Sequence, residues 1–303
     1  MKILDWFFAA RPLLHVPVWS VFLVGLHYHH QLSGGTFQPV DLLLMVSLSL
    51  LFAAAFYVNQ VFDRESDRIN RKGGFLESGL ISERAMMASY PLLSILALAS
   101  TLLLSAVTLV IFLQIVVLAL IYSAPPVRLK DRPAGGLFAN AYAHGFLVSL
   151  AVMPEMTMHN AGLLGWDNPF YFALAVGAVY ILTTIPDEKG DRLTGKRTLA
   201  VIFGRTGSLV ASLVLMLASA YVARESGFFL LFSLSAFAAV TIVAALVWRT
   251  LAAVRLAAKL PLLLLTALAG FWYPGYFVFI VALLVGTRIY YKKRFGVVYP
   301  KVA

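Results

Sequence analysis

Long apolar runs constrain the fold of this chain more than any other feature. Residues 229–248, for example, contain no Asp, Glu, Lys or Arg, and a helix of about 20 apolar residues is long enough to cross a bilayer. Charged residues make up only 13% of the 303 residues, whereas soluble domains typically contain about 25%. We therefore predict an all-α, polytopic membrane helical bundle, with residues 1–303 forming a single domain in the lipid bilayer.

Hydropathy along the chain predicts about nine transmembrane helices. The expected spans lie near 12–31, 40–62, 84–104, 106–122, 135–153, 169–186, 207–223, 229–248 and 272–290. A further apolar stretch, 257–270, is interrupted by Lys259 and Pro261, and we interpret it as an interfacial helix or as an extension of the last span. The segment from Met1 to Arg11 has no small-residue cleavage site, which favours an uncleaved start over a removable signal peptide.

The basic residues alternate between loops. Lys and Arg follow the second, fourth and sixth expected spans, whereas the loops after the first, third and fifth contain neither. The positive-inside rule therefore predicts that the N-terminus and the ends of the even-numbered spans are cytoplasmic. It also accounts for the net charge of +10 without a nucleic-acid partner. Nine spans would leave Lys292, Lys293 and Arg294 outside, against the rule, unless the 257–270 segment changes the count or the earlier loops dominate.

Acidic residues are few, 14 in all, and two groups of them stand where an expected span ends on the cytoplasmic side. Asn59, Asp63 and Asp67 are spaced i, i+4, i+8 and share one face of a helix, and Asp187 and Asp191 repeat the i, i+4 spacing. Carboxylates at a helix C-terminus repel the helix dipole and each other, and a divalent cation would reverse both effects. Oxygen ligands without His or Cys suit Mg²⁺. The alternative is a solvated loop with ion pairs to neighbouring basic residues.

Basic residues next to these carboxylates predict an anionic substrate. Arg pairs with phosphate through two hydrogen bonds, and Lys acts as a point charge, so acids, bases and Mg²⁺ together indicate a diphosphate. The apolar walls indicate that this diphosphate carries a hydrophobic tail. The candidate diphosphate-binding residues are Arg68, Arg71, Lys72, Arg128 and Lys130, together with Tyr122, which ends the fourth span beside them.

Three motifs resemble those of the UbiA-type intramembrane prenyltransferases. Asn59-x₃-Asp63-x₃-Asp67 is similar to the first Asp-rich motif of that family, and Asp187-Glu-Lys-Gly-Asp191 is similar to the second. Between them, the segment Tyr-Ser-Ala-Pro-Pro-Val-Arg-Leu-Lys at 122–130 resembles the stretch that follows the fourth helix of the family.

The resemblance implies nine helices around a central cavity, with the Asp-rich loops at its cytoplasmic mouth. It implies two Mg²⁺ ions, held by Asn59, Asp63, Asp67, Asp187 and Asp191, that bridge the diphosphate of an isoprenyl diphosphate. The allylic carbon would ionise and be attacked by a lipophilic acceptor, for which we expect an aromatic or quinone-precursor compound. A glycerol phosphate lipid is the alternative acceptor, and cyclisation or hydrolysis of the cation stays open.

Three positions depart from the family pattern, and they leave the acceptor open. Gln60 stands where many members have Asp, Gly74-Phe75 where many have Arg-Pro, and Thr184 where many have Asp. A cation-coupled transporter is the alternative from a different class, but its ionisable groups would lie near the bilayer midplane, whereas here they lie at span ends. The cluster at 27–30, with three histidines, is more typical of an interface than of a metal site.

Overall fold

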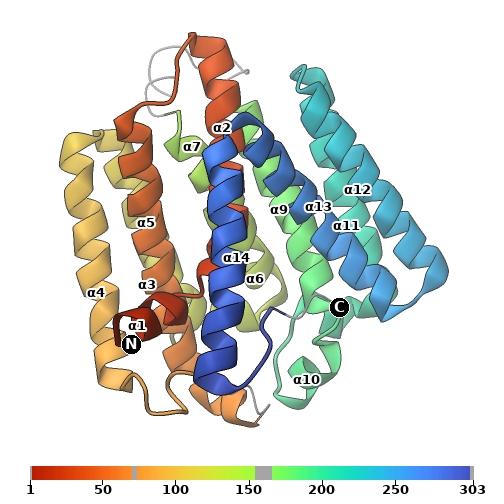
Figure 1. The fold of residues 1–303 in the computed structure, drawn as a ribbon. Coiled ribbons are helices and arrows are strands. Elements are labelled where there is room, and N and C mark those ends of the chain that lie inside the picture. The colour runs from red at the N-terminus through yellow and green to blue at the C-terminus, as the bar shows by residue number, and fades with distance from the viewer. Residues whose placement is uncertain (1, 70–73, 154–165, 301–303) are drawn as a thin grey trace.

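The computed structural model describes residues 2–69, 74–153 and 166–300, and the side chains of residues 66–69 fall outside the description. Throughout this part the chain is helical and contains no strand, which confirms the predicted class. The elements that form the bundle, shown in Figure 1, are α1 (Lys2–Ala9), α2 (Pro12–Ser33), α3 (Pro39–Ile69), α4 (Glu83–Ser100), α5 (Ala106–Ser123), α6 (Pro133–Asn140), the π-helix η3 (Ala141–Leu147), α7 (Val148–Ala151), α9 (Asp167–Thr184), α10 (Glu188–Leu193), α11 (Leu199–Glu225), α12 (Phe229–Trp248), α13 (Leu251–Trp272) and α14 (Pro274–Phe295). Two 3₁₀ turns, η1 (Thr101–Leu103) and η2 (Leu129–Asp131), lie between them.

Half of these helices have the length and apolar composition of membrane spans. Seven helices of the described residues are long and apolar enough to cross a bilayer, and the bent pair α1–α2 makes an eighth if it is counted as one span. The run α6–η3–α7 and the helix α9 also extend along the bundle (Figure 1). The 54° bend between α1 and α2 lies at Arg11, which has a left-handed backbone (φ 54°), and Pro12 then starts α2, a position where its missing N–H costs nothing.

The stretch expected as an interfacial segment or an extension of the last span is a helix of its own, α13. It begins at a cap, where the Thr250 side chain accepts a hydrogen bond from the N–H of Ala253, and α14 starts anew at Pro274. The two helices run in opposite directions (Figure 1). Because α13 adds one more crossing of the bundle, the basic C-terminal end of α14 lies at the same end of the bundle as α1.

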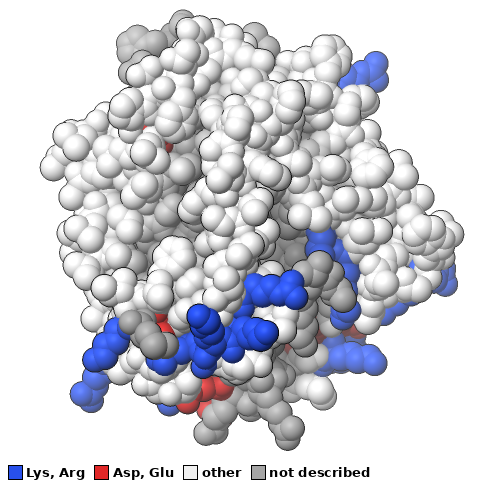
Figure 2. Space-filling model, viewed as in Figure 1, with Lys and Arg blue, Asp and Glu red and all other residues white. Residues whose placement is uncertain are grey.

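Contacts between the two chain ends agree with this arrangement. The guanidinium of Arg294 lies 2.9 Å from the buried carboxylate of Asp5, and the hydroxyl of Tyr290 donates to the same carboxylate over 2.5 Å. Figure 2 shows that most Lys and Arg side chains visible on this face gather at that end, while the band above them is almost free of charge.

The middle of the bundle depends on one close backbone approach. A Cβ atom added to Gly145 in η3 would lie 2.5 Å from the carbonyl oxygen of Phe172 in α9, a distance that no side chain can occupy. Gly145 therefore lets α9 pack directly against η3, which fixes the position of the π-helix beside the site described next.

Candidate active site

The C-terminal part of α3 carries the first predicted ladder. The Asn59 amide donates to the hydroxyl of Ser123, at the end of α5, over 3.4 Å. One turn later, Asp63 accepts a hydrogen bond of 2.7 Å from the ammonium of Lys130. Asp67 follows in the last turn of α3, and its side chain lies outside the described residues. Asn59 and Asp63 thus lie on one face of α3, as their spacing predicted.

The turn η2, which follows α5, brings Lys130 to this ladder. Arg128 precedes the turn with a left-handed backbone (φ 40°), and its guanidinium pairs with Asp131 at 2.9 Å. The Lys130 and Asp63 side chains are only 7% and 17% exposed. Burial lowers the pKa of Lys130 below its ordinary value, and the carboxylate of Asp63 acts in the opposite direction. A predicted phosphate ligand is therefore held in an ion pair with a predicted metal ligand.

The second Asp-rich segment forms α10 and the loop after it. Asp187 directly precedes α10 and is exposed. Asp191 is half-buried, accepts a hydrogen bond from Thr198 over 3.2 Å, and lies 3.8 Å from the ammonium of Lys196. The backbone N–H of Arg197 donates to the carbonyl of Asp131 over 3.0 Å. The turn η2 therefore contacts α3 through one residue and the loop after α10 through the next.

Some of the predicted ligands cannot be placed. Arg71 and Lys72 lie outside the described residues, as does the side chain of Arg68. Among the residues that are described, no three His, Asp or Glu side chains are close enough to hold a metal ion together. The five-ligand cage therefore stays a prediction, while both Asp-rich segments lie at one end of the bundle (Figure 1).

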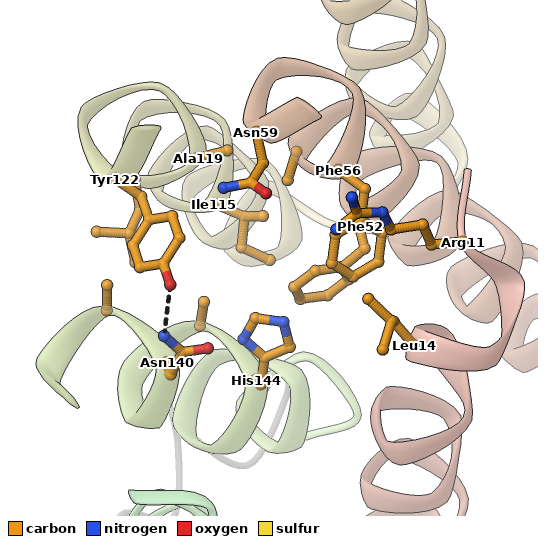
Figure 3. A pocket seen from close by; sticks show the side chains of 14 residues that line it. Arg11, Leu14, Phe52, Phe56, Asn59, Ile115, Ala119, Tyr122, Asn140 and His144 are labelled. Atoms are coloured by element: carbon orange, nitrogen blue, oxygen red, sulfur yellow. Dashed lines mark hydrogen bonds between the residues drawn. The ribbon is translucent and has the colours of Figure 1, made fainter. Parts of the chain in front are cut away.

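A cavity of about 180 Å³ lies next to this ladder, among α2, α3, α5, α6 and η3. Figure 3 shows that Asn59 and Tyr122 line it from one side and Asn140 and His144 from the other. The amide of Asn140 donates to the hydroxyl of Tyr122 over 3.3 Å, and Arg11 also reaches the cavity. Apart from these residues, the lining is aliphatic or aromatic.

Three polar lining residues were missed by the sequence analysis: Arg11, Asn140 and His144. Asn140 and His144 are spaced i, i+4, as are the first two residues of the ladder, so the spacing was available as a signal. It did not stand out because neither residue carries a fixed charge and neither lies at a span end. The cavity position of Arg11 depends on the bend between α1 and α2, which local sequence does not reveal.

A larger apolar groove of about 860 Å³ lies on the other side of the α2–α3 pair. Its walls come from α1, α2, α3 and α14, and they include Phe7, Trp19, Tyr57 and Phe279. The indole of Trp19 donates to Ser49 over 2.7 Å, which satisfies one of the few polar groups in this wall. The groove provides an extended apolar surface beside the cavity.

Two of the departures from the family pattern have structural roles in this chain. The amide of Gln60 is buried and donates to the carbonyls of Ala9 and Phe56 over 2.8 and 3.0 Å, so it fastens α1 to α3. Phe75 is buried against the aromatic rings of Tyr290 and Phe295. Neither residue acts as a charged ligand.

The histidines at the opposite end of α2 make ordinary interfacial contacts. The ring of His27 stacks on Trp272 with 3.6 Å between centroids. His30 lies 3.8 Å from the carboxylate of Asp41.

Comparison with known proteins identifies the same family as the motifs do. Residues 18–260 match the sequence model of the UbiA prenyltransferase family. A lycopene elongase/hydratase from Haloarcula japonica is 26% identical over 220 residues, which cover 70% of this chain and 71% of that protein. A digeranylgeranylglyceryl phosphate synthase from Methanoculleus marisnigri is 33% identical over 179 residues, which cover 57% of this chain and 60% of the synthase.

Solved structures share the fold. A UbiA homolog from Archaeoglobus fulgidus, bound to DMAPP and Mg²⁺, superposes with a TM-score of 0.68 at 19% identity, over 88% of this chain and 99% of that one. Another structure of a UbiA homolog from the same organism gives a TM-score of 0.73 at 18% identity, over 92% of this chain and 98% of that one.

Proposed function

This chain belongs to the UbiA prenyltransferase family, and from that premise we propose that it transfers an isoprenyl group from an isoprenyl diphosphate to a lipophilic acceptor, with Mg²⁺ as cofactor. The observation that carries the proposal is the position of η2. Its Lys130 reaches Asp63 of the first Asp-rich segment, and its Asp131 carbonyl binds the loop after the second. Both segments are thereby held together beside one cavity.

The residues of the two segments fit a hard divalent cation. The candidate ligands offer amide and carboxylate oxygens only, which Mg²⁺ prefers, and Asp63 already neutralises its charge with a cation, the ammonium of Lys130. We assign the metal to Asn59, Asp63, Asp67, Asp187 and Asp191. When bound, Mg²⁺ would neutralise the diphosphate oxygens and stabilise the charge of the leaving group.

The basic residues of the chain bind the rest of the diphosphate. Lys130 contacts Asp63 of the ladder and Arg128 lies two residues before it, and their charges attract phosphate oxygens. Arg68, Arg71 and Lys72 follow the ladder in sequence and are assigned the same role. With the diphosphate and metal bound, Lys130 would exchange its contact with Asp63 for one with a phosphate oxygen.

The apolar surfaces accept the hydrocarbon parts of the substrates. The cavity beside Asn59 and Tyr122 has room for a single small group, so it would hold the reacting unit away from water, which would otherwise quench an allylic cation. The groove along α2, α3 and α14 is long and apolar enough for an isoprenoid chain. We place the Asp-rich end of the bundle on the cytoplasmic side, because Lys and Arg gather there.

The acceptor is proposed only as a class. An aromatic or quinone-precursor acceptor suits the small cavity, and a glycerol phosphate lipid is the second candidate. That candidate is favoured by the 33% identity to a digeranylgeranylglyceryl phosphate synthase. The similarity to a lycopene elongase/hydratase supports a hydrocarbon as a third class of acceptor.

The proposal is tested by diphosphate release from geranyl and geranylgeranyl diphosphate by the purified protein in detergent. We expect release with Mg²⁺, none with EDTA, and a loss of about 100-fold or more in Asp63→Asn and Asp187→Asn, because direct metal ligands contribute at least as much as their outer-shell partners. Asp41→Asn, a carboxylate at the other end of α3, is the matched control and should keep full activity.

Full activity in Asp63→Asn or Asp187→Asn would contradict the metal assignment. No Mg²⁺-dependent release with either donor would contradict the enzyme class and favour a transporter. Product analysis with added acceptors separates transfer from cyclisation and hydrolysis.

A further inference from the structure

The outer face of α13 carries two basic side chains inside a membrane span. Arg255 and Lys259 are spaced i, i+4, so they stand one turn apart on one face of the helix, and both are exposed. Leu263 continues the same face one turn further and is 62% exposed. We call these three residues the α13 stripe. The opposite face of α13, which includes Val254 and Leu265, is buried in the bundle, so the stripe faces the surroundings of the protein.

The depth of Lys259 makes an unpaired charge unfavourable. The 22 residues of α13 correspond to about 33 Å at 1.5 Å per residue, which matches the hydrocarbon core of about 30 Å. Lys259 is the ninth residue of the helix and therefore lies about 12 Å along its axis. Charged side chains at such a depth are rare and usually pair with one another. Among the described residues, neither Arg255 nor Lys259 forms an ion pair.

The neighbours of the stripe add positive charge. Arg249 ends α12 just before α13, and its carbonyl accepts a hydrogen bond of 2.7 Å from the guanidinium of Arg205. From residue 192 onward the sequence contains a single acidic residue, Glu225, which lies at the far end of α11. Figure 2 shows that the basic side chains extend from the lower end of the bundle up over α13. This part of the chain therefore offers the stripe no counter-charge at that end.

The order of the side chains along the stripe matches a lipid with an anionic head. Two cations one turn apart suit a phosphate, because Arg binds it through two hydrogen bonds and Lys acts as a point charge. The long stem of Lys259 lets its ammonium reach toward the interface, where lipid phosphates lie. Leu263 then offers apolar surface deeper in the bilayer. Basic residues at a membrane surface attract anionic lipids in this way.

We propose that the α13 stripe is a binding site for an anionic phospholipid from the leaflet at the Asp-rich end of the bundle. The lipid phosphate pairs with Arg255 and Lys259, and an acyl chain lies along Leu263. Binding supplies the counter-charge for two cations that would otherwise border hydrocarbon. The site is separate from the proposed reaction, because none of its residues lines the cavity or the groove described above.

The test compares two lipids that share their acyl chains and differ in net charge. Binding of dioleoylphosphatidylglycerol and dioleoylphosphatidylcholine to the purified protein in neutral detergent is measured by native mass spectrometry. We expect the wild type to prefer the anionic lipid, and Lys259→Gln and Arg255→Gln each to weaken its binding about fivefold, the contribution of one basic residue near a membrane surface. Lys259→Arg keeps the charge and should bind as the wild type does.

Lys293→Gln is the matched control, because it removes one exposed charge at the same end of the bundle, from α14, and should leave the binding unchanged. An equal loss in Lys293→Gln would show general attraction to a basic surface and overturn the site. No preference in the wild type, or an undiminished preference in the double variant Arg255→Gln/Lys259→Gln, would also overturn it. Geranylgeranyl diphosphate should leave the phospholipid bound, and its displacement of the lipid would reassign the stripe to the substrate.

Both substituted side chains are exposed, so every variant should unfold at the temperature of the wild type. This measurement separates a lost lipid contact from a lost fold. Weaker lipid binding that appears only together with a lowered unfolding temperature, and that Lys259→Arg does not restore, would contradict the proposal.

Discussion

The ion pair between Lys130 and Asp63 makes a quantitative prediction. Lys130→Met removes the ammonium that lies 2.7 Å from the carboxylate and keeps most of the side chain's length. Removing one partner of a buried pair costs about 3–5 kcal/mol, because the other charge is left uncompensated. Since the Asp63 side chain is 17% exposed, water screens part of the charge, and we expect about 2–3 kcal/mol.

The assay is thermal unfolding in detergent, with EDTA or with Mg²⁺. In EDTA the variant should unfold roughly 4–10 °C below the wild type. In Mg²⁺ the difference should shrink, because the metal takes the place of the ammonium beside the carboxylate and stabilises the folded state by mass action. The stabilisation by Mg²⁺ should therefore be larger in the variant than in the wild type.

The double variant Asp63→Asn/Lys130→Met is the control. Without the carboxylate there is no uncompensated charge, so it should unfold above the single Lys130→Met variant in EDTA and gain no such additional stabilisation from Mg²⁺. The reasoning is refuted if Lys130→Met matches the wild type in EDTA, or if Mg²⁺ stabilises the double variant as much as the single one.

Further predictions concern other parts of the bundle. Gln60→Leu should destabilise by about 1–3 kcal/mol, because the Ala9 carbonyl loses its buried donor, and limited proteolysis should then release the α1 segment sooner. Gly145→Ala should lower the unfolding temperature sharply or prevent folding, since its Cβ would lie 2.5 Å from the Phe172 oxygen, whereas Gly190→Ala, with nothing within 4 Å, should be neutral. Chelation by EDTA should stop diphosphate release and readdition of Mg²⁺ should restore it, and activity that survives exhaustive chelation would contradict the metal dependence.

The class of the protein and the first ladder could be predicted because both are local properties. Apolar length identifies a span regardless of its neighbours, and the i, i+4 spacing of Asn59 and Asp63 puts them on one helix face in any fold. The number of spans could not be fixed at 257–270, because Lys259 and Pro261 interrupt the apolar run there. In the structure these residues lie inside α13, which a helix accommodates when the charged side chain reaches an aqueous interface.

The resemblance implied a central cavity, but most of its lining could not be predicted, because the lining residues come from helices that are distant in sequence. His144 and Asn140 resemble any polar residues on an amphipathic helix until α3 and α5 are placed opposite them. The contact between Lys130 and Asp63 was missed for a related reason. Lys130 was assigned to the diphosphate and Asp63 to the metal, and their pairing with each other depends on the path of the chain between α5 and η2.

The groove beside the cavity has a consequence for how the protein is made. Its walls come from α1 and α2, at the start of the chain, and from α14, at its end, and Asp5 binds Arg294 across the same junction. At ribosomal rates of about 5–20 residues per second, the first helices wait on the order of tens of seconds for the last one. During that interval the groove lacks the wall that α14 supplies, so its apolar residues on α2 and α3 stay open on that side.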